Sequence, residues 1–303
     1  MEKTIVTLRT FFACIAISFL LAGICSNISA QQVIGLSIGY EYFPYAELAD
    51  PIEGAEDFEI QTTSRSMGAS FPLSFANGKI LILNQISYKR VDFSYRNFPG
   101  GDSEIEQAQS IKYTFFMLDS LSEKWSLVAV LTPGLASDFE GKVTSDDFTF
   151  EGVFGFIRKF KKNFSLGAGA AYIRDFGKPL PLPFIYFDWN IGSNLSASGI
   201  VPNNIDLLYR LNPKVDLGLS LKIGGNRYHG DPRRFDVKNP QMEYSEGTIS
   251  PIVQLHISEW LHLNMEGGLA FYRNFEFLDG DDQKASYDLK QTGYLRAGLV
   301  LGM

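Results

Sequence analysis

Residue type alternates with period two along almost the whole chain after Gln31, and this alternation limits the possible folds more than any other feature. Successive side chains of a β-strand point to opposite faces, so the pattern predicts strands with one apolar and one polar face. It is clearest in residues 215–225 and recurs in residues 33–42, 67–75, 125–135, 164–172, 248–258 and 261–274. No run of 18 apolar residues occurs in this part of the chain, so membrane-spanning helices are not expected.

The polar face of these segments distinguishes a transmembrane barrel from a water-soluble β-sandwich. The outward face of a sandwich is dominated by Lys, Glu and Thr, whereas here the polar face is rich in Gly, Ser and Ala. Small residues suit a curved wall around a confined interior, while the apolar face meets hydrocarbon. The predicted fold is therefore all-β: an antiparallel, up-and-down transmembrane β-barrel formed by residues 31–303.

Short and long connections alternate along the chain, as expected for a meander that crosses a membrane. The short ones are turn-forming segments, and the long ones are polar. We predict about fourteen strands, counting residues 195–201 and 204–211 as a short hairpin about Pro202 and Asn203, with twelve as the alternative. The short connections are residues 76–79, 119–124, 161–163, 192–193, 212–214 and 258–259, and the long ones are residues 44–57, 97–104, 138–147, 175–181, 228–241 and 274–286.

Residues 1–30 have the features of a cleavable export signal. Lys3 and Arg9 precede an apolar run of residues 10–24, which is too short to span a bilayer, and small residues follow up to Ala30. Both cysteines, Cys14 and Cys25, lie in this segment, so the mature protein is expected to have no disulfide or thiol chemistry. Lipidation at Cys25 is a weaker alternative, because Ile24 precedes it where a small residue is required.

Two further features support a barrel in the outer membrane. Trp125, Trp189 and Trp260 all fall near short turns, and Trp favours the interface between hydrocarbon and water. The chain ends in "TGYLRAGLVLGM", which matches the final-strand signal that the barrel-assembly machinery reads, although the terminal residue is usually aromatic. The residues of this predicted insertion signal are Arg296, Gly298, Leu301 and Met303. Both termini are expected to be periplasmic.

Charged and histidine side chains on the polar face are predicted to line the lumen. A charge facing lipid at mid-depth would cost roughly 2 to 4 kcal/mol, so these groups should point inward and pair with one another. The predicted lumen-lining residues are Lys112, Glu151, Asp188, Arg210, Asp216, Lys222, His256, His262, Glu266 and Arg296.

Catalytic and metal-binding alternatives are weaker. His256 and Ser258 have the His-x-Ser spacing of some outer-membrane lipid hydrolases, which places both side chains on one face. However, Ser258 lies at a short turn, on the rim away from outer-leaflet lipid. Acidic residues at 279–282 and in the loop at 44–57 lack the full spacing of an EF-hand and are better interpreted as solvated loops, or as loops that meet lipopolysaccharide through shared divalent cations. Arg233, Arg234 and Lys238 could contact lipid phosphates.

Charge argues against nucleic acid as a partner. The net charge is −7, and it becomes −8 without Glu2, Lys3 and Arg9 of the export segment, with no basic block to compensate. The sequence contains no glycine-rich phosphate loop, so we expect no cofactor. The expected partners are outer-membrane lipid, lipopolysaccharide and, during insertion, the barrel-assembly machinery.

The segment "PLPFIYFDWNIGSNLSASGIVPNNIDLLYRLNPKVDLGLSLKIGGNRYH" resembles the uncharacterised outer-membrane β-barrels of Bacteroidota and related Gram-negative bacteria, a family of unknown function. The resemblance covers most of residues 31–303 and implies a location and a fold, without catalytic residues. A passive channel or pore for small solutes is the leading functional hypothesis. A lipid-modifying hydrolase and a structural or surface-interaction barrel without transport are the alternatives.

Overall fold

The alternating segments of the sequence form antiparallel strands in the computed structural model, which describes residues 34–50, 57–97, 105–174, 179–233 and 237–302. A single turn of 3-10 helix, η1 (Ser145–Asp147), joins two of them. No helix in these ranges is long and apolar enough to cross a membrane. The strands are β1 (Gly35–Glu47), β2 (Glu59–Phe75), β3 (Ile80–Arg96), β4 (Gln107–Ser120), β5 (Trp125–Ser137), β6 (Phe148–Lys161), β7 (Phe164–Ile173), β8 (Leu180–Ile191), β9 (Leu195–Val201), β10 (Asn204–Asn212), β11 (Val215–His229), β12 (Pro240–Ser258), β13 (Leu261–Asp279), β14 (Asp282–Asp288) and β15 (Thr292–Leu301).

The strands close into a barrel of fourteen positions. Each strand from β1 to β13 pairs with its sequence neighbour, and β15 pairs with both β13 and β1. Strand β14 pairs only with the end of β13 beyond the part that β15 covers, so β14 and β15 together occupy one position in the ring. The predicted fold and the count of fourteen are confirmed, including the hairpin of β9 and β10.

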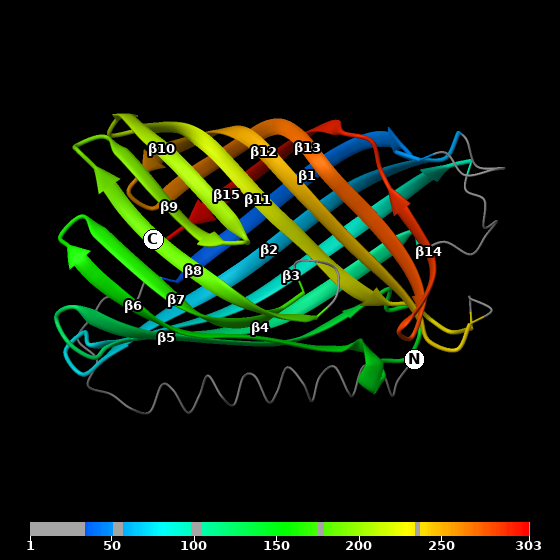
Figure 1. The fold of residues 1–303 in the computed structure, drawn as a ribbon, viewed down its shortest axis with the longest axis horizontal. Coiled ribbons are helices and arrows are strands. Elements are labelled where there is room, and N and C mark those ends of the chain that lie inside the picture. The colour runs from blue at the N-terminus through cyan, green and yellow to red at the C-terminus, as the bar shows by residue number, and fades with distance from the viewer. Residues whose placement is uncertain (1–33, 51–56, 98–104, 175–178, 234–236, 303) are drawn as a thin grey trace.

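The two rims of the barrel differ in the length of their connections (Figure 1). The short turns lie at one end, which we call the short-turn rim, and the long connections lie at the other, the long-loop rim. Gly35 and Leu301 pair with residues at the short-turn rim, so the first and last described residues lie there. Trp125, Trp189 and Trp260 lie at the same rim and are exposed.

The outer wall is apolar. Exposed side chains on it include Leu36, Ile38, Phe154, Leu219 and Leu295, of which Leu295 is 62 % exposed and Leu219 54 %. Apolar patches of this extent are rare on monomeric soluble proteins. The alternation of the sequence therefore places the apolar face outward, where hydrocarbon would cover it.

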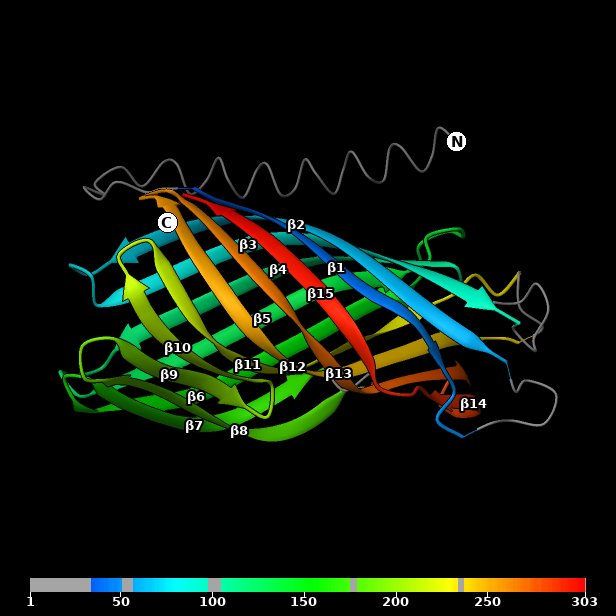
Figure 2. The ribbon, with the colours of Figure 1, turned by 90° about the horizontal axis from the view of Figure 1, so that it is seen from above.

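The barrel wall is shorter at one place, between the tip of the β9–β10 hairpin and the long-loop rim. Pairing of β10 with β11 stops at Asn204 and Lys222, and the hairpin ends mid-way along the barrel (Figure 1). Beyond that point β11 leans inward, and its last residue, His229, pairs in parallel with Ser137 of β5 on the far side of the hairpin. Strands β6 to β10 therefore lie outside a smaller ring that β5 and β11 close at the long-loop rim (Figure 2).

Candidate functional site

The interior of the barrel is the candidate site, and its inward arginines become less exposed from the short-turn rim to the long-loop rim. Near the short-turn rim, the Arg210 side chain is 60 % exposed. At mid-height, Arg296 is 18 % exposed. Closer to the long-loop rim, Arg273 is 1 % exposed and Phe275 is fully buried. The lumen is thus accessible from one end and filled with protein at the other.

A histidine and aspartate cluster lies near the short-turn end of the lumen. Asp216 accepts hydrogen bonds from Nε and Nη2 of Arg210 at 3.0 and 3.2 Å, and its Oδ2 is 3.1 Å from Nε2 of His256. Nδ1 of His256 lies 2.8 Å from Nδ1 of His262, so one ring donates to the other. The predicted lumen residues Arg210, Asp216, His256 and His262 thus form one connected group.

This cluster bears directly on the hydrolase hypothesis. Both ring nitrogens of His256 are engaged by Asp216 and His262, while Oγ of Ser258 accepts a hydrogen bond from the Trp260 amide at 3.4 Å. The strand register shifts between His256 and Ser258, which moves Ser258 out of the regular alternation. The structure therefore does not bring this His and Ser together as a nucleophile and base.

At mid-height, six side chains from six strands form a network of ion pairs along the inner wall from β11 through β15 to β3, which we call the ion-pair layer. Its members are Glu41, Lys89, Lys222, Glu246, Glu266 and Arg296. Arg296 is its centre, because its guanidinium contacts Glu41, Glu266 at 2.8 Å and Glu246 at 3.4 Å. Lys89 contacts Glu41 at 2.9 Å, and Lys222 contacts Glu266. Three cations balance three carboxylates, which keeps the layer neutral; the carboxylates and Arg296 are largely buried, while Lys89 and Lys222 are partly exposed.

The remaining predicted lumen charges lie on the opposite wall. Nζ of Lys112 on β4 donates to Glu151 on β6 at 2.6 Å. Asp188 on β8 accepts only a long hydrogen bond, 3.5 Å from Asn190. These three residues lie on the β4–β8 side, apart from the ion-pair layer, so the predicted set divides into three groups.

Arg273 lies beyond the ion-pair layer and has no carboxylate partner among the residues that the structure describes. Its Nη2 donates to Thr62 at 3.0 Å, and its guanidinium lies 4.9 Å from the ring centre of Phe43. Phe43 in turn stacks on Tyr294 with ring centres 5.3 Å apart. Nε and Nη1 of Arg273 have no hydrogen-bond partner, so aromatic faces provide much of its stabilisation.

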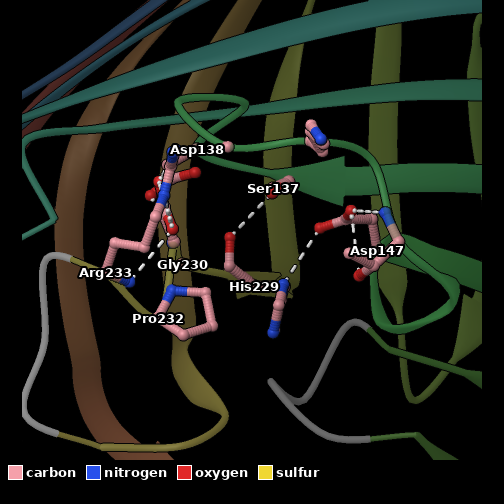
Figure 3. Close-up of a pocket in the computed structure, with 11 residues that line it drawn as sticks. Ser137, Asp138, Asp147, His229, Gly230, Pro232 and Arg233 are labelled. Atoms are coloured by element: carbon pink, nitrogen blue, oxygen red, sulfur yellow. Dashed lines mark hydrogen bonds and ion pairs between the residues drawn. The ribbon is translucent and has the colours of Figure 1, made fainter.

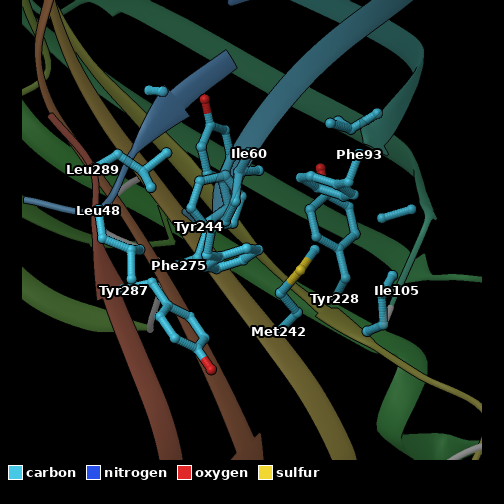
Figure 4. Close-up of a cluster of buried hydrophobic side chains, with 14 of the residues drawn as sticks. Leu48, Ile60, Phe93, Ile105, Tyr228, Met242, Tyr244, Phe275, Tyr287 and Leu289 are labelled. Carbon is cyan, nitrogen blue, oxygen red and sulfur yellow. The ribbon is translucent and has the colours of Figure 1, made fainter. Parts of the chain in front are cut away.

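The long-loop half of the lumen is filled by an apolar plug (Figure 4). Aromatic rings interlock within it: Tyr244 and Phe275 have ring centres 4.7 Å apart, and Phe93 meets Phe275 edge-on at 5.8 Å. The sequence predicts a polar, small-residue inner wall, but the long-loop half is apolar, and on the β4–β8 side apolar side chains such as Phe116, Val128 and Ile157 also line the short-turn half. The plug consists of Ala46, Leu48, Phe58, Ile60, Val91, Phe93, Ile105, Ala108, Ala136, Tyr228, Met242, Tyr244, Phe275, Tyr287 and Leu289.

Where β5 and β11 meet, the protein surface holds a cavity of about 280 Å³, which we call the rim pocket (Figure 3). Nδ1 of His229 lies 3.0 Å from Asp147, and Oγ of Ser137 donates to the His229 carbonyl at 2.9 Å. Burial alone would raise the pKa of Asp147, but hydrogen bonds from His229 and the Thr144 amide hold that pKa below the ordinary aspartate value. Burial raises the pKa of Asp138, on the other side of the pocket.

Some interior residues were not among the lumen-lining residues predicted from the sequence. Glu41 occupies an inward position in the alternation of β1, so the same rule could have identified it. Lys89 and Glu246 lie in segments without clean alternation. Arg273 was missed because the alternation of residues 261–274 puts it on the apolar, outward face, whereas a register shift at Phe271 turns it inward.

The structure places other predicted residues without testing their roles. Arg296 points inward, as expected, and Leu295 points outward. Asp279 accepts a hydrogen bond from the Asn239 amide at 2.9 Å, and Arg233 pairs with Asp231. In the described ranges, no group of three or more His, Cys, Asp or Glu side chains is arranged to hold a metal ion. The export segment, Cys14, Cys25, Arg234 and Met303 lie outside the described residues.

A closed ring of antiparallel strands with an apolar exterior defines the class of this protein as an outer-membrane-type β-barrel. The chain belongs to the family described as a domain of unknown function, DUF6268, whose model matches residues 26–302. No curated protein matches the sequence.

Several solved outer-membrane barrels are similar in structure. The COG4313 outer membrane channel from Pseudomonas putida F1 shares 11 % identity over 93 % of this chain and 98 % of its own, with a TM-score of 0.48. The P. putida toluene transporter TodX shares 9 % identity over 90 % of each chain, with a TM-score of 0.43. A bacterial polysaccharide outer membrane secretin shares 8 % over 91 % of this chain and all of its own, with a TM-score of 0.42. At these values the similarity says nothing about function.

Proposed function

We propose that this chain is an outer-membrane channel for small molecules that is closed at its long-loop end in the state described. The observation that supports this most directly is the contrast along the lumen between the exposed Arg210 at one end and the buried Phe275 at the other. A purely structural barrel would not require accessible polar groups at one end of its interior while the other end is packed.

The closed end has a specific construction. The apolar plug gathers side chains from both sides of the long-loop end, so a polar solute moving along the barrel axis would have to displace it, whereas the ion-pair layer lines one side of the lumen. Opening a packed aromatic cluster forfeits its buried apolar area. Conduction along the axis therefore requires a rearrangement of these side chains, and a wide, permanently open pore is not expected.

Planar-bilayer recording tests this proposal. The purified wild-type chain should give few or small conductance steps. Replacing Tyr228, Met242 and Phe275 together with Ala should remove the centre of the plug and produce frequent, larger steps. A control triple variant, Phe148→Ala, Phe150→Ala and Phe154→Ala, removes exposed outer-wall rings of β6 and should conduct like the wild type.

A folded plug variant that shows no more conductance or liposome solute flux than the wild type would overturn the channel proposal. It would favour a structural or surface-interaction barrel. Folding of each variant is checked by its resistance to unfolding in SDS without heating, which does not depend on transport.

A further inference from the structure

Between the tip of the β9–β10 hairpin and the long-loop rim, two strand edges have no partner among the described residues. On β8, pairing with β9 begins only at Ile185, so Leu180 to Phe184 pair with β7 alone. On β11, the Ile223 amide donates to the Asn203 carbonyl at 2.8 Å, and no strand pairs with this edge again until His229. The two free edges face each other across the hairpin tip.

The residues of the β8 edge are suited to remaining unpaired. The Asn190 amide donates to Asn163 on the β7 side, and the β7–β8 register has no shift, so even-numbered amides of β8 point to β7. Positions 181 and 183 point to the open edge, and both are prolines, which have no amide hydrogen to leave unsatisfied. The opening is therefore built into the sequence of β8.

A second, smaller cavity of about 120 Å³, which we call the side pocket, lies at the end of this opening nearer the long-loop rim. It is lined by Ala136 on the inner wall of β5 and by Arg227 and His229 on the face of β11 that points away from the plug. Arg174, at the end of β7, completes its wall, with Gln241 and the exposed Asp146. The side pocket and the plug thus lie on opposite faces of β11, and Ala136 of β5 borders both.

One cation of the side pocket has no counter-ion among the described residues. Arg227 is paired with Glu243, and His229 with Asp147, but Arg174 makes no hydrogen bond or ion pair with any described side chain, including Asp146, which also lines the pocket. Nε of Arg174, Nε of Arg227 and Nε2 of His229 are all buried without a hydrogen-bond partner. Burial, and next the neighbouring Arg227 cation, lower the pKa of Arg174, as expected for a desolvated guanidinium that has no bound anion.

From the side pocket towards the short-turn rim, the inner wall is apolar. Leu180, Leu182 and Phe184 point inward from the unpaired part of β8, and Ile173 precedes Arg174 on β7. Phe184 packs in a cluster with Val128 and Ala171, and Ile173 and Tyr186 contact this cluster. The opening therefore combines an apolar inner wall with one cation that has no partner among the described residues, next to an outer wall that faces hydrocarbon.

We propose that this lateral opening admits amphiphilic monocarboxylates from the membrane, with the carboxylate bound by Arg174 in the side pocket and the apolar tail along Leu180, Leu182 and Phe184. A monoanion matches the single unpaired charge, and the guanidinium fork matches carboxylate geometry. The inference rests on the proposed channel function, because it names the class of solute and the route by which it enters. This lateral route bypasses the closed long-loop end of the barrel.

Binding to the full-length mature chain in lipid nanodiscs tests the ligand without requiring transport. Dodecanoate should bind the wild type, and Arg174→Gln should weaken it about 10- to 100-fold, the loss expected for a charge-assisted hydrogen bond. Arg174→Lys should retain part of the affinity. Lys142→Gln removes an exposed cation at the same rim and should have no effect. Dodecanol should bind more weakly than dodecanoate, and equally to all four proteins.

Two outcomes would overturn the assignment of the site. One is equal binding of dodecanoate and dodecanol to the wild type, or dodecanoate binding that Arg174→Gln does not change. The other is complete competition by inorganic phosphate alone, which would mean that the pocket binds a free anion without an apolar tail. Absence of conductance or flux with Arg174-dependent dodecanoate binding would contradict the channel proposal and leave this site intact.

The route is tested by narrowing the opening. Gly225 lies on the open edge of β11, and its side-chain position faces the opening and not the plug. Gly225→Phe should slow dodecanoate association about 10-fold while changing the Kd less than about 3-fold, because an obstacle at an entrance slows entry and exit alike. An unchanged association rate in the folded variant would show that the ligand enters elsewhere.

Discussion

At the scale of single residues, Arg296 is the side chain on which the interior depends most. It contacts three carboxylates, and its removal would leave Glu41, Glu246 and Glu266 with only two cations among them. Breaking a buried ion pair from one side costs about 3 to 5 kcal/mol, so we expect Arg296→Met to lower the free energy of unfolding by at least that amount. Urea unfolding in lipid vesicles measures it.

The matched control for Arg296 is Lys290, whose pair with Glu47 lies in solvent at the long-loop rim. Exposed pairs contribute little to stability, so Lys290→Ala should unfold at the same urea concentration as the wild type. If the two variants lose similar stability, the ion pairs of Arg296 are not desolvated as the burial of Arg296 and its carboxylates indicates.

A second prediction at this scale concerns pH and the pair of Asp147 and His229. The pKa of Asp147 is held below its ordinary value, so this carboxylate stabilises the fold above the unfolded-state pKa of about 3.9 and loses that effect as pH falls through its lower folded value. Asp147→Asn should therefore be less stable than the wild type at neutral pH, and the difference should shrink towards zero in strong acid. A constant difference across the titration would contradict this origin.

At the scale of elements, the open edge of β8 predicts different effects of substitution at adjacent positions. Pro183 faces the unpaired edge, so Pro183→Thr should change stability by less than about 1 kcal/mol. Leu182 directs its amide to β7, so Leu182→Pro removes a ladder hydrogen bond and should cost about 2 kcal/mol or more. Unfolding of both variants in vesicles checks this, and equal losses would mean that this edge of β8 is paired after all.

At the scale of the whole molecule, the property to test is whether hydrocarbon or water surrounds the outer wall. Leu219 lies near the middle of the paired part of β11 and is 54 % exposed. Leu219→Arg should cost roughly 2 to 4 kcal/mol if hydrocarbon covers this face, whereas a surface substitution in water stays within about 0.5 kcal/mol. Unfolding in phospholipid vesicles distinguishes the two, and a near-neutral result would contradict a membrane location.

Much of the fold follows from local sequence. Period-two alternation in residues 215–225 and 261–274 predicts β11 and β13 and the face of each that points outward, because the pleat of a strand sends alternate side chains to opposite sides. Turn-forming residues such as Pro202 and Asn203 predict the β9–β10 hairpin. The inward orientation of Arg210, Asp216 and Arg296 follows from the same rule, since a charge facing hydrocarbon is costly.

Only the tertiary structure decides which inward side chains meet. Alternation determines which face of the strand a side chain occupies, but not its position along the barrel axis or its partner on another strand. Those depend on the tilt of every strand and on the register shift summed over all strand pairs around the barrel. For this reason the sequence predicts inward charges, yet the convergence of Glu41, Lys89 and Arg296 appears only in the folded barrel. The inward lean of β11 to Ser137, and with it the opening beside Arg174, has the same origin.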